Sequence, residues 1–213
     1  MTDFSTGVTA ALLLAGATMT WLGWVLLPSR IGIFFAPGDF AKVHARFRPW
    51  IWLFRIHLFG HVVTVMALVA FGTLATEAAV RVVAWPAIAI SSAGLLVSAL
   101  AAAFYYHFGA WGALDMAGKS ENDIVNFVGS LRVTTEYVTC LVRFGRVFFG
   151  LGQLVLAVAL FQFGLGPVGT LGAILGLAAM AVTLGFPDDL DYYMPIFHVN
   201  ALWLATIGLA LLT

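Results

Sequence analysis

Long apolar segments recur along the chain and alternate with short polar connections. A run of about 20 apolar residues can cross a hydrocarbon core of about 30 Å as an α-helix. Six such runs occur, at residues 8–27, 51–74, 83–114, 143–163, 168–186 and 195–212. The third run is longer than a perpendicular crossing requires, which indicates a tilted or extended helix. The pattern predicts an all-α polytopic integral membrane protein, with one transmembrane domain over residues 1–213 and about six transmembrane helices.

Two polar connections have helical patterns of their own. Residues 35–50 mix basic and aromatic side chains, as in a helix that lies in the headgroup plane. Residues 120–142 begin with Ser120 and early acidic residues, a pattern typical of a helix N-cap. A helix from there to the end of the fourth apolar run would be about 60 Å long. Since that is twice the membrane core, we expect an interfacial segment and a break near Gly129 or Gly145.

Glycine and proline positions suggest how these helices begin and pack. Pro86 and Pro195 lie near the expected starts of the third and sixth runs, where proline is tolerated in a first helical turn. The fifth run carries glycines at spacings that form a smooth stripe for close helix packing. They are Gly166, Gly169, Gly172 and Gly176. We expect the stripe to contact another helix of this chain or a partner subunit.

Composition agrees with a membrane protein. Of 213 residues, 62% are hydrophobic and 9% are charged, whereas a soluble domain has about 25% charged residues. The formal net charge is zero, so bulk charge gives no reason to expect a nucleic-acid partner. The single cysteine, Cys140, permits neither an intrachain disulfide nor a cysteine cluster for a metal.

The basic residues predict an orientation. All Lys and Arg residues except Arg81 lie in or beside the first and third connections between the apolar runs. Cytoplasmic loops retain Lys and Arg, so these basic loops are expected in the cytoplasm and both termini outside. The first residues include Asp3 and no Lys or Arg, unlike a cleaved secretory signal. We therefore expect a bacterial-type inner or plasma membrane protein.

Four histidines are predicted to lie in one shallow layer of the membrane, close to the cytoplasmic face. They come from three apolar runs and are His57, His61, His107 and His198. Ionisable groups at membrane depth are costly and usually face an internal site, a partner or a water-filled cavity. Each histidine alone is more often a packing residue or an interfacial anchor, but their shared depth favours a common site.

One hypothesis for this site is a b-type haem in a redox subunit. Haem ligation requires imidazoles with aromatic and apolar walls around the macrocycle. His107 opposite His57 or His61 is the favoured axial pair, and His198 is a further candidate. The remaining predicted contacts are aromatic walls and arginines for the propionates, namely Tyr105, Tyr106, Arg55 and Arg143.

A second hypothesis is a transition-metal centre in a membrane enzyme. His57 and His61 are spaced i and i+4, so they share one helical face. His107 and His198 could complete a four-nitrogen set for iron, copper or zinc. Asp115 or Glu136 would supply a carboxylate ligand or orient an imidazole.

A third hypothesis places no metal or haem at the histidines. A quinone, alone or beside a haem, could occupy a cavity lined by these histidines and tyrosines. Alternatively, the chain could be a cofactor-free accessory subunit of a larger membrane complex or a homo-oligomer. The sequence leaves these alternatives open, together with the substrate and the electron donor or acceptor.

Overall fold

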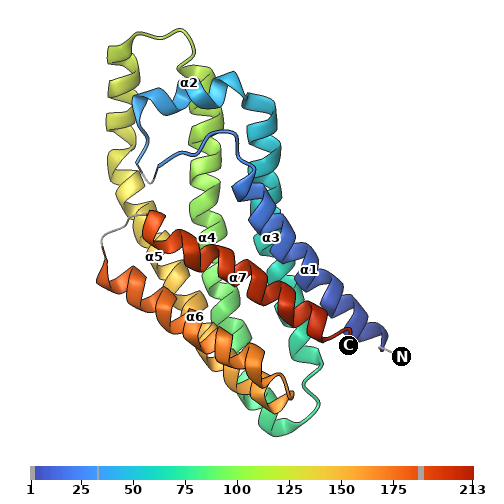
Figure 1. The fold of residues 1–213 in the computed structure, drawn as a ribbon. Helices are drawn as coiled ribbons and strands as arrows, with labels where there is room; N and C mark the ends of the chain where they lie inside the picture. The colour runs from blue at the N-terminus through green and yellow to red at the C-terminus, as the bar shows by residue number, and fades with distance from the viewer. Residues whose placement is uncertain (1–2, 33, 187–189) are drawn as a thin grey trace.

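The fold is a bundle of long helices, seen in a computed structural model that describes residues 3–32, 34–186 and 190–213. Within these residues seven helices occur and no strand (Figure 1). Their bounds are α1 Phe4–Val25, α2 Pro37–Ala45, α3 Phe47–Thr73, α4 Ala78–Asp115, α5 Glu121–Gln162, α6 Gly166–Gly185 and α7 Leu190–Ala210. All except α2 are long and apolar enough to cross a membrane, which gives six such helices in the described part. The predicted all-α fold with six spans is confirmed.

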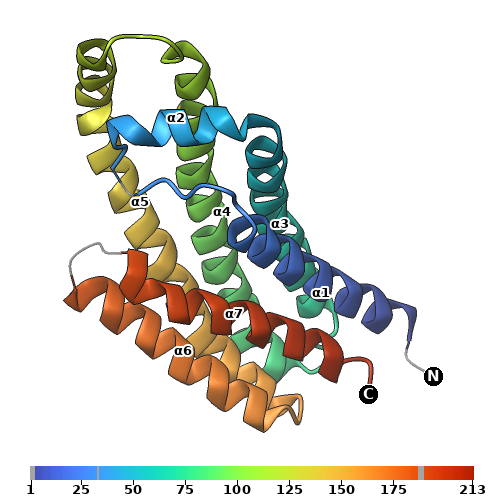
Figure 2. The ribbon, with the colours of Figure 1, turned by 45° about the horizontal axis from the view of Figure 1, so that its top comes forward.

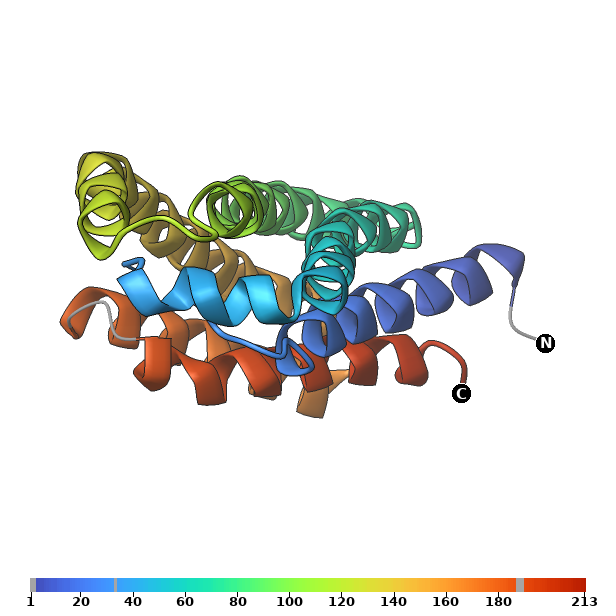
Figure 3. The same cartoon turned by 90° about the horizontal axis from the view of Figure 1, so that it is seen from above.

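The six long helices form a closed ring. Each packs against two neighbours in the order α1, α3, α4, α5, α6, α7 and back to α1 (Figure 3). The short helix α2 lies across one end of the ring, against α3, α4 and α5 (Figure 2). The start of α1 and the end of α7 lie near each other (Figure 1). The ring therefore has an interior, and α2 covers it at one end.

The expected break in the fourth span is wrong, because α5 is continuous over 42 residues. At 1.5 Å per residue it is about 63 Å long. Gly145 is buried against Ser98 of α4 and so permits close packing instead of a bend. The predicted N-cap is confirmed, since the Ser120 hydroxyl accepts from the backbone N–H of Asp123 at 3.3 Å.

The positions of two prolines also differ from the prediction. Pro86 lies inside α4, which begins at Ala78, and Pro195 lies inside α7, which begins at Leu190. Both helices thus start earlier than the hydrophobic pattern indicates. Polar residues such as Arg81 and Tyr192 extend the helices beyond the apolar runs.

Buried side chains form two main hydrophobic clusters. One includes Phe71, Leu156 and Trp203 and joins α1, α3, α4, α5, α6 and α7. The other includes Trp50, Phe40 and Leu131 and joins α2 and its flanking connection to α3, α4 and α5. Large apolar side chains also cover the outer surface, including Phe59, Leu100 and Leu202. An apolar exterior of this kind is suited to a lipid bilayer.

The glycine stripe of α6 packs inside the chain. A Cβ atom at Gly169 or Gly176 would meet backbone atoms of α5, and one at Gly172 would meet the indole of Trp203 in α7. These glycines bring α6 close to both of its ring neighbours. Three of the four stripe glycines are therefore used within the bundle.

Candidate functional site

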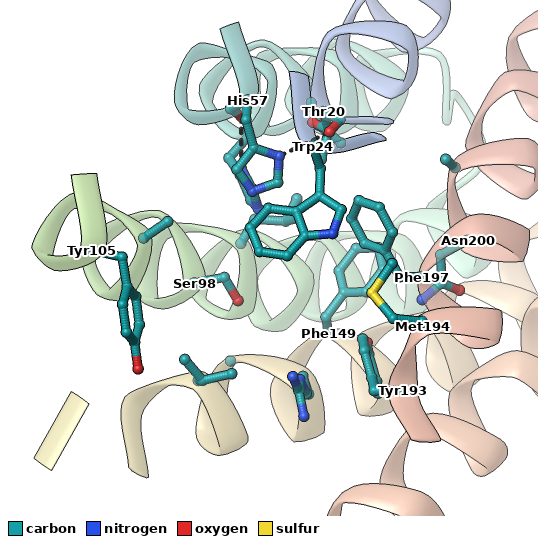
Figure 4. A pocket seen from close by; sticks show the side chains of 18 of the residues that line it. Thr20, Trp24, His57, Ser98, Tyr105, Phe149, Tyr193, Met194, Phe197 and Asn200 are labelled. Atoms are coloured by element: carbon teal, nitrogen blue, oxygen red, sulfur yellow. Dashed lines mark hydrogen bonds between the residues drawn. The ribbon is translucent and has the colours of Figure 1, made fainter. Parts of the chain in front are cut away.

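A cavity of about 190 Å³ lies in the interior of the ring. Its walls come from α1, α3, α4, α5 and α7 and from the connection between α1 and α2 (Figure 4). Ala17 and Phe149 in its wall belong to one hydrophobic cluster, and Trp50 and Phe54 belong to the other. The cavity therefore lies between the two clusters.

Aromatic side chains form much of the wall. They come from every helix that lines the cavity and are Trp24, Trp50, Phe54, Tyr105, Phe149, Tyr193 and Phe197. The Trp24 ring lies 5.4 Å from that of His57, and the Phe197 ring lies 6.3 Å from it, both between centroids. Flat, apolar walls of this kind suit a planar apolar ligand.

A close crossing of α1 and α3 positions the histidines. Gly23 of α1 lies directly against the backbone of His57, and Gly60 of α3 lies against the backbone of Thr20. Neither position has room for a Cβ atom. As a result the Nδ1 atom of His57 lies 2.8 Å from the carbonyl oxygen of Thr20.

Both cavity histidines have a defined tautomer. The Nδ1 atom of His61 lies 3.0 Å from the carbonyl oxygen of His57, one turn earlier in α3. A carbonyl oxygen can only accept, so each Nδ1 carries the hydrogen, and in the neutral imidazole each Nε2 then carries a lone pair. Both side chains line the cavity and are nearly buried, at 7% exposure each. The site thus offers two imidazole acceptors, and this protonation pattern also suits a metal-binding imidazole.

Hydrogen-bond donors are present as well. The indole Nε1 of Trp24 is buried and has no hydrogen-bond partner among the described residues. The guanidinium of Arg146 lies 4.2 Å from the ring centroid of Tyr193. Deeper in the bundle, Gln153 Nε2 donates to Asn200 Oδ1 at 2.9 Å. Arg146, Tyr193 and Asn200 all line the cavity, so it has polar groups on the α5–α7 side.

Only some of the predicted site residues meet here. His57, His61 and Tyr105 line the cavity. His107 is exposed and does not line it. His198 accepts a hydrogen bond from Trp21 Nε1 at 2.8 Å, at the contact between α1 and α7.

The other predicted residues lie outside the cavity. Arg55 donates from Nε to the Tyr106 hydroxyl at 2.8 Å, and Arg143 donates to the backbone carbonyl of Thr183 at 2.6 Å. Glu136 forms an exposed ion pair with Arg132 at 3.3 Å. Asp115 is exposed at the last residue of α4.

The predicted four-histidine metal centre does not assemble. Within the residues that the structure describes, no group of three or more His, Cys, Asp or Glu side chains could hold a metal ion. The predicted axial pair does not assemble either, because His107 does not reach the cavity. His57 and His61 lie on adjacent turns of the same helix, whereas a bis-histidine haem needs imidazoles from opposite sides.

Sequence reasoning missed several residues that shape this site. Thr20 and Trp24 lie at i and i+4 on α1, but nothing in the first apolar run marks them as facing α3. Gln153 could have been found, because a polar amide inside an apolar run usually hydrogen-bonds another helix. Its partner Asn200 lies in the sixth run.

In comparisons with known proteins, the chain matches no protein-family model, no curated protein and no solved structure.

Proposed function

We propose that this chain binds the ring of a quinone in its cavity and serves as the quinone-binding subunit of a redox membrane complex. The observation that carries the proposal is a pair of histidines that line an aromatic, ring-sized cavity, each with Nδ1 held by a backbone carbonyl oxygen. A neutral imidazole held in this way has its Nε2 lone pair available for a ligand. Aromatic walls suit the quinone ring, and the bilayer suits its hydrophobic tail.

The size of the cavity supports a single ring. An apolar protein cavity of about 150 Å³ accommodates benzene. The volume here is about 190 Å³, which allows one ring with small substituents. A haem macrocycle is several times larger than benzene, so it would require the helices to move apart. The geometry favours the quinone hypothesis over the haem hypothesis.

The arrangement of polar groups also supports a quinone. A ring oxygen in the oxidised form accepts hydrogen bonds, for which Trp24 and Arg146 are donors. A ring hydroxyl in the reduced form donates, for which His57 and His61 are acceptors. The site therefore has partners for both oxidation states.

The proposal includes a path for the tail and an orientation for the chain. Gly32 in the cavity wall is exposed and Met194 is half-buried, so the cavity approaches the molecular surface between the α1–α2 connection and α7. An isoprenoid tail can leave there. The basic loops face the cytoplasm in this account. The group that exchanges electrons with the quinone belongs to a partner subunit.

A combined analysis of one detergent-purified sample tests the proposal. Organic extracts are assayed for quinone, and binding of an added short-chain benzoquinone is measured by equilibrium dialysis. We expect saturable binding in the unmodified protein, and the reduced form of the same probe should bind about threefold to tenfold more weakly to the His57→Phe, His61→Phe double variant. The matched variant His107→Phe changes a histidine outside the cavity and is expected to bind normally.

The same sample separates the alternatives. A reduced-minus-oxidised spectrum with sharp α and β bands would replace the quinone with haem b. Stoichiometric iron, copper or zinc without haem would favour a metal-dependent enzyme. A folded protein with no quinone, haem or metal, and with no saturable quinone binding, would indicate a cofactor-free accessory subunit.

A further inference from the structure

We infer that the cavity selects the reduced, hydroquinone form of its ligand, with His57 as the acceptor for a ligand hydroxyl. The inference rests on the proposed quinone binding and adds the redox state that the site prefers. It follows from the direction of the hydrogen bonds that His57 and His61 make to the backbone.

The tautomer of His57 is fixed by helix packing. Gly23 and Gly60 bring α1 and α3 together, so the Thr20 carbonyl oxygen lies 2.8 Å from His57 Nδ1. The other neutral tautomer would place a nitrogen lone pair against an oxygen lone pair at that distance. The backbone of α1 cannot rotate to relieve this contact without unwinding. Nδ1 therefore keeps the hydrogen, and Nε2 offers only a lone pair.

A neutral Nε2 lone pair distinguishes the two forms of the ligand. A quinone carbonyl has no hydrogen to donate, so it makes no hydrogen bond to Nε2. A hydroquinone hydroxyl donates to Nε2 while its oxygen still accepts from another group. His61 has the same tautomer, so both imidazoles in the cavity favour the reduced form.

The donors in the cavity do not offset this preference. Trp24 Nε1–H and the Arg146 guanidinium can donate to a quinone carbonyl or to a hydroquinone oxygen alike. The selectivity therefore depends on the histidines. One additional hydrogen bond corresponds to an affinity ratio of about threefold to tenfold.

The test compares three probes on the same solubilised protein under anaerobic conditions. The probes are a decyl-substituted benzohydroquinone, the matching benzoquinone and the dimethyl ether of the hydroquinone. The ether keeps the ring and its oxygens but cannot donate a hydrogen bond. We expect the hydroquinone to bind about threefold to tenfold more tightly than either of the others.

Variants assign the preference to the histidines. In the His57→Phe, His61→Phe double variant the three affinities should become equal, whereas His107→Phe should keep the difference. His57→Gln provides a smaller change, since its amide can donate as well as accept, and the ratio should fall. If the double variant does not fold, the unmodified protein still tests the inference, because the hydroquinone should bind more tightly than its dimethyl ether.

The outcomes separate the two proposals. Equal binding of quinone and hydroquinone by the unmodified protein would overturn the redox preference and leave quinone binding intact. A difference that persists in the folded double variant would show that other groups select the reduced form, against the role of His57. If none of the probes binds saturably, the proposed function fails and this inference fails with it.

Discussion

At the scale of single residues, two glycines and two histidines depend on each other. Gly23 and Gly60 allow the backbones of α1 and α3 to touch, and this contact places His57 Nδ1 on the Thr20 carbonyl. The histidine pair at i and i+4 was evident in the sequence. The carbonyl that fixes its tautomer was not, because it depends on how two distant segments cross.

A methyl group at Gly23 tests this crossing. A Cβ atom there would lie 2.7 Å from the Leu53 carbonyl oxygen and 2.8 Å from His57 Cα, and neither backbone atom can yield. We expect Gly23→Ala to lower the free energy of unfolding by about 1–3 kcal/mol. Gly7→Ala in the same helix is the control, since no atom lies within 4 Å of its added Cβ. Thermal unfolding in detergent measures both, and equal stability of the two variants would refute the close crossing.

The buried amide pair provides a second prediction. Gln153 is fully buried and bonds Asn200 at 2.9 Å. Either single change to Leu leaves the other buried amide without this bond and should destabilise the protein by about 1–3 kcal/mol. The double change removes both partners, so its cost should be less than the sum. A double-mutant cycle should give a coupling of about 0.6–1.7 kcal/mol, and strict additivity would show that the bond contributes nothing.

At the scale of elements, hydrophobic periodicity predicted the existence of the helices more accurately than their ends. Six apolar runs became six long helices, but α5 extends through a segment that was expected to be separate. Polar residues such as Asn126 and Glu136 hide the first half of α5 from a hydropathy pattern. That half packs through Leu131 and Phe127 against α2 and α4. This tertiary packing keeps the helix continuous, and local sequence does not reveal it.

The start of α5 provides a test at this scale. Ser120 and Asp123 form a reciprocal capping box, in which each side chain accepts from the other's backbone N–H. Ser120→Ala should cost about 1 kcal/mol and loosen the first turn. Hydrogen exchange of the amides after residue 120 should accelerate about fivefold. Ser130→Ala, at an exposed position inside the same helix, is the control and should leave that exchange unchanged.

At the scale of the whole molecule, a closed ring of six long helices surrounds an aromatic cavity, and α2 lies across one end. Of the residues that the depth argument from the sequence grouped, His57, His61 and Tyr105 line the cavity. His107 and His198 were grouped with them because depth along a helix says nothing about the direction of a side chain. The helical rotation that turns His107 outward depends on packing with α3 and α5.

The predicted orientation can be tested at opposite ends of α4. In a Cys140→Ser background, Lys119→Cys and Glu77→Cys each place one thiol in an exposed connection, beyond the two ends of this helix. If the basic loops are cytoplasmic, an impermeant maleimide should label Lys119→Cys only in inside-out vesicles. It should label Glu77→Cys only in right-side-out vesicles. The reverse pattern would invert the topology.

Photolabelling with an azido-substituted benzoquinone tests the central claim most directly, because it locates the ligand. After illumination, the labelled peptides are identified by mass spectrometry, with and without excess short-chain benzoquinone. The account predicts competed labels on cavity residues of α1, α3 and α7, such as Trp24, Phe54 and Met194, and none on α6. Labels confined to outward side chains such as Phe59, or labels that the excess quinone does not compete, would contradict a quinone site inside the ring.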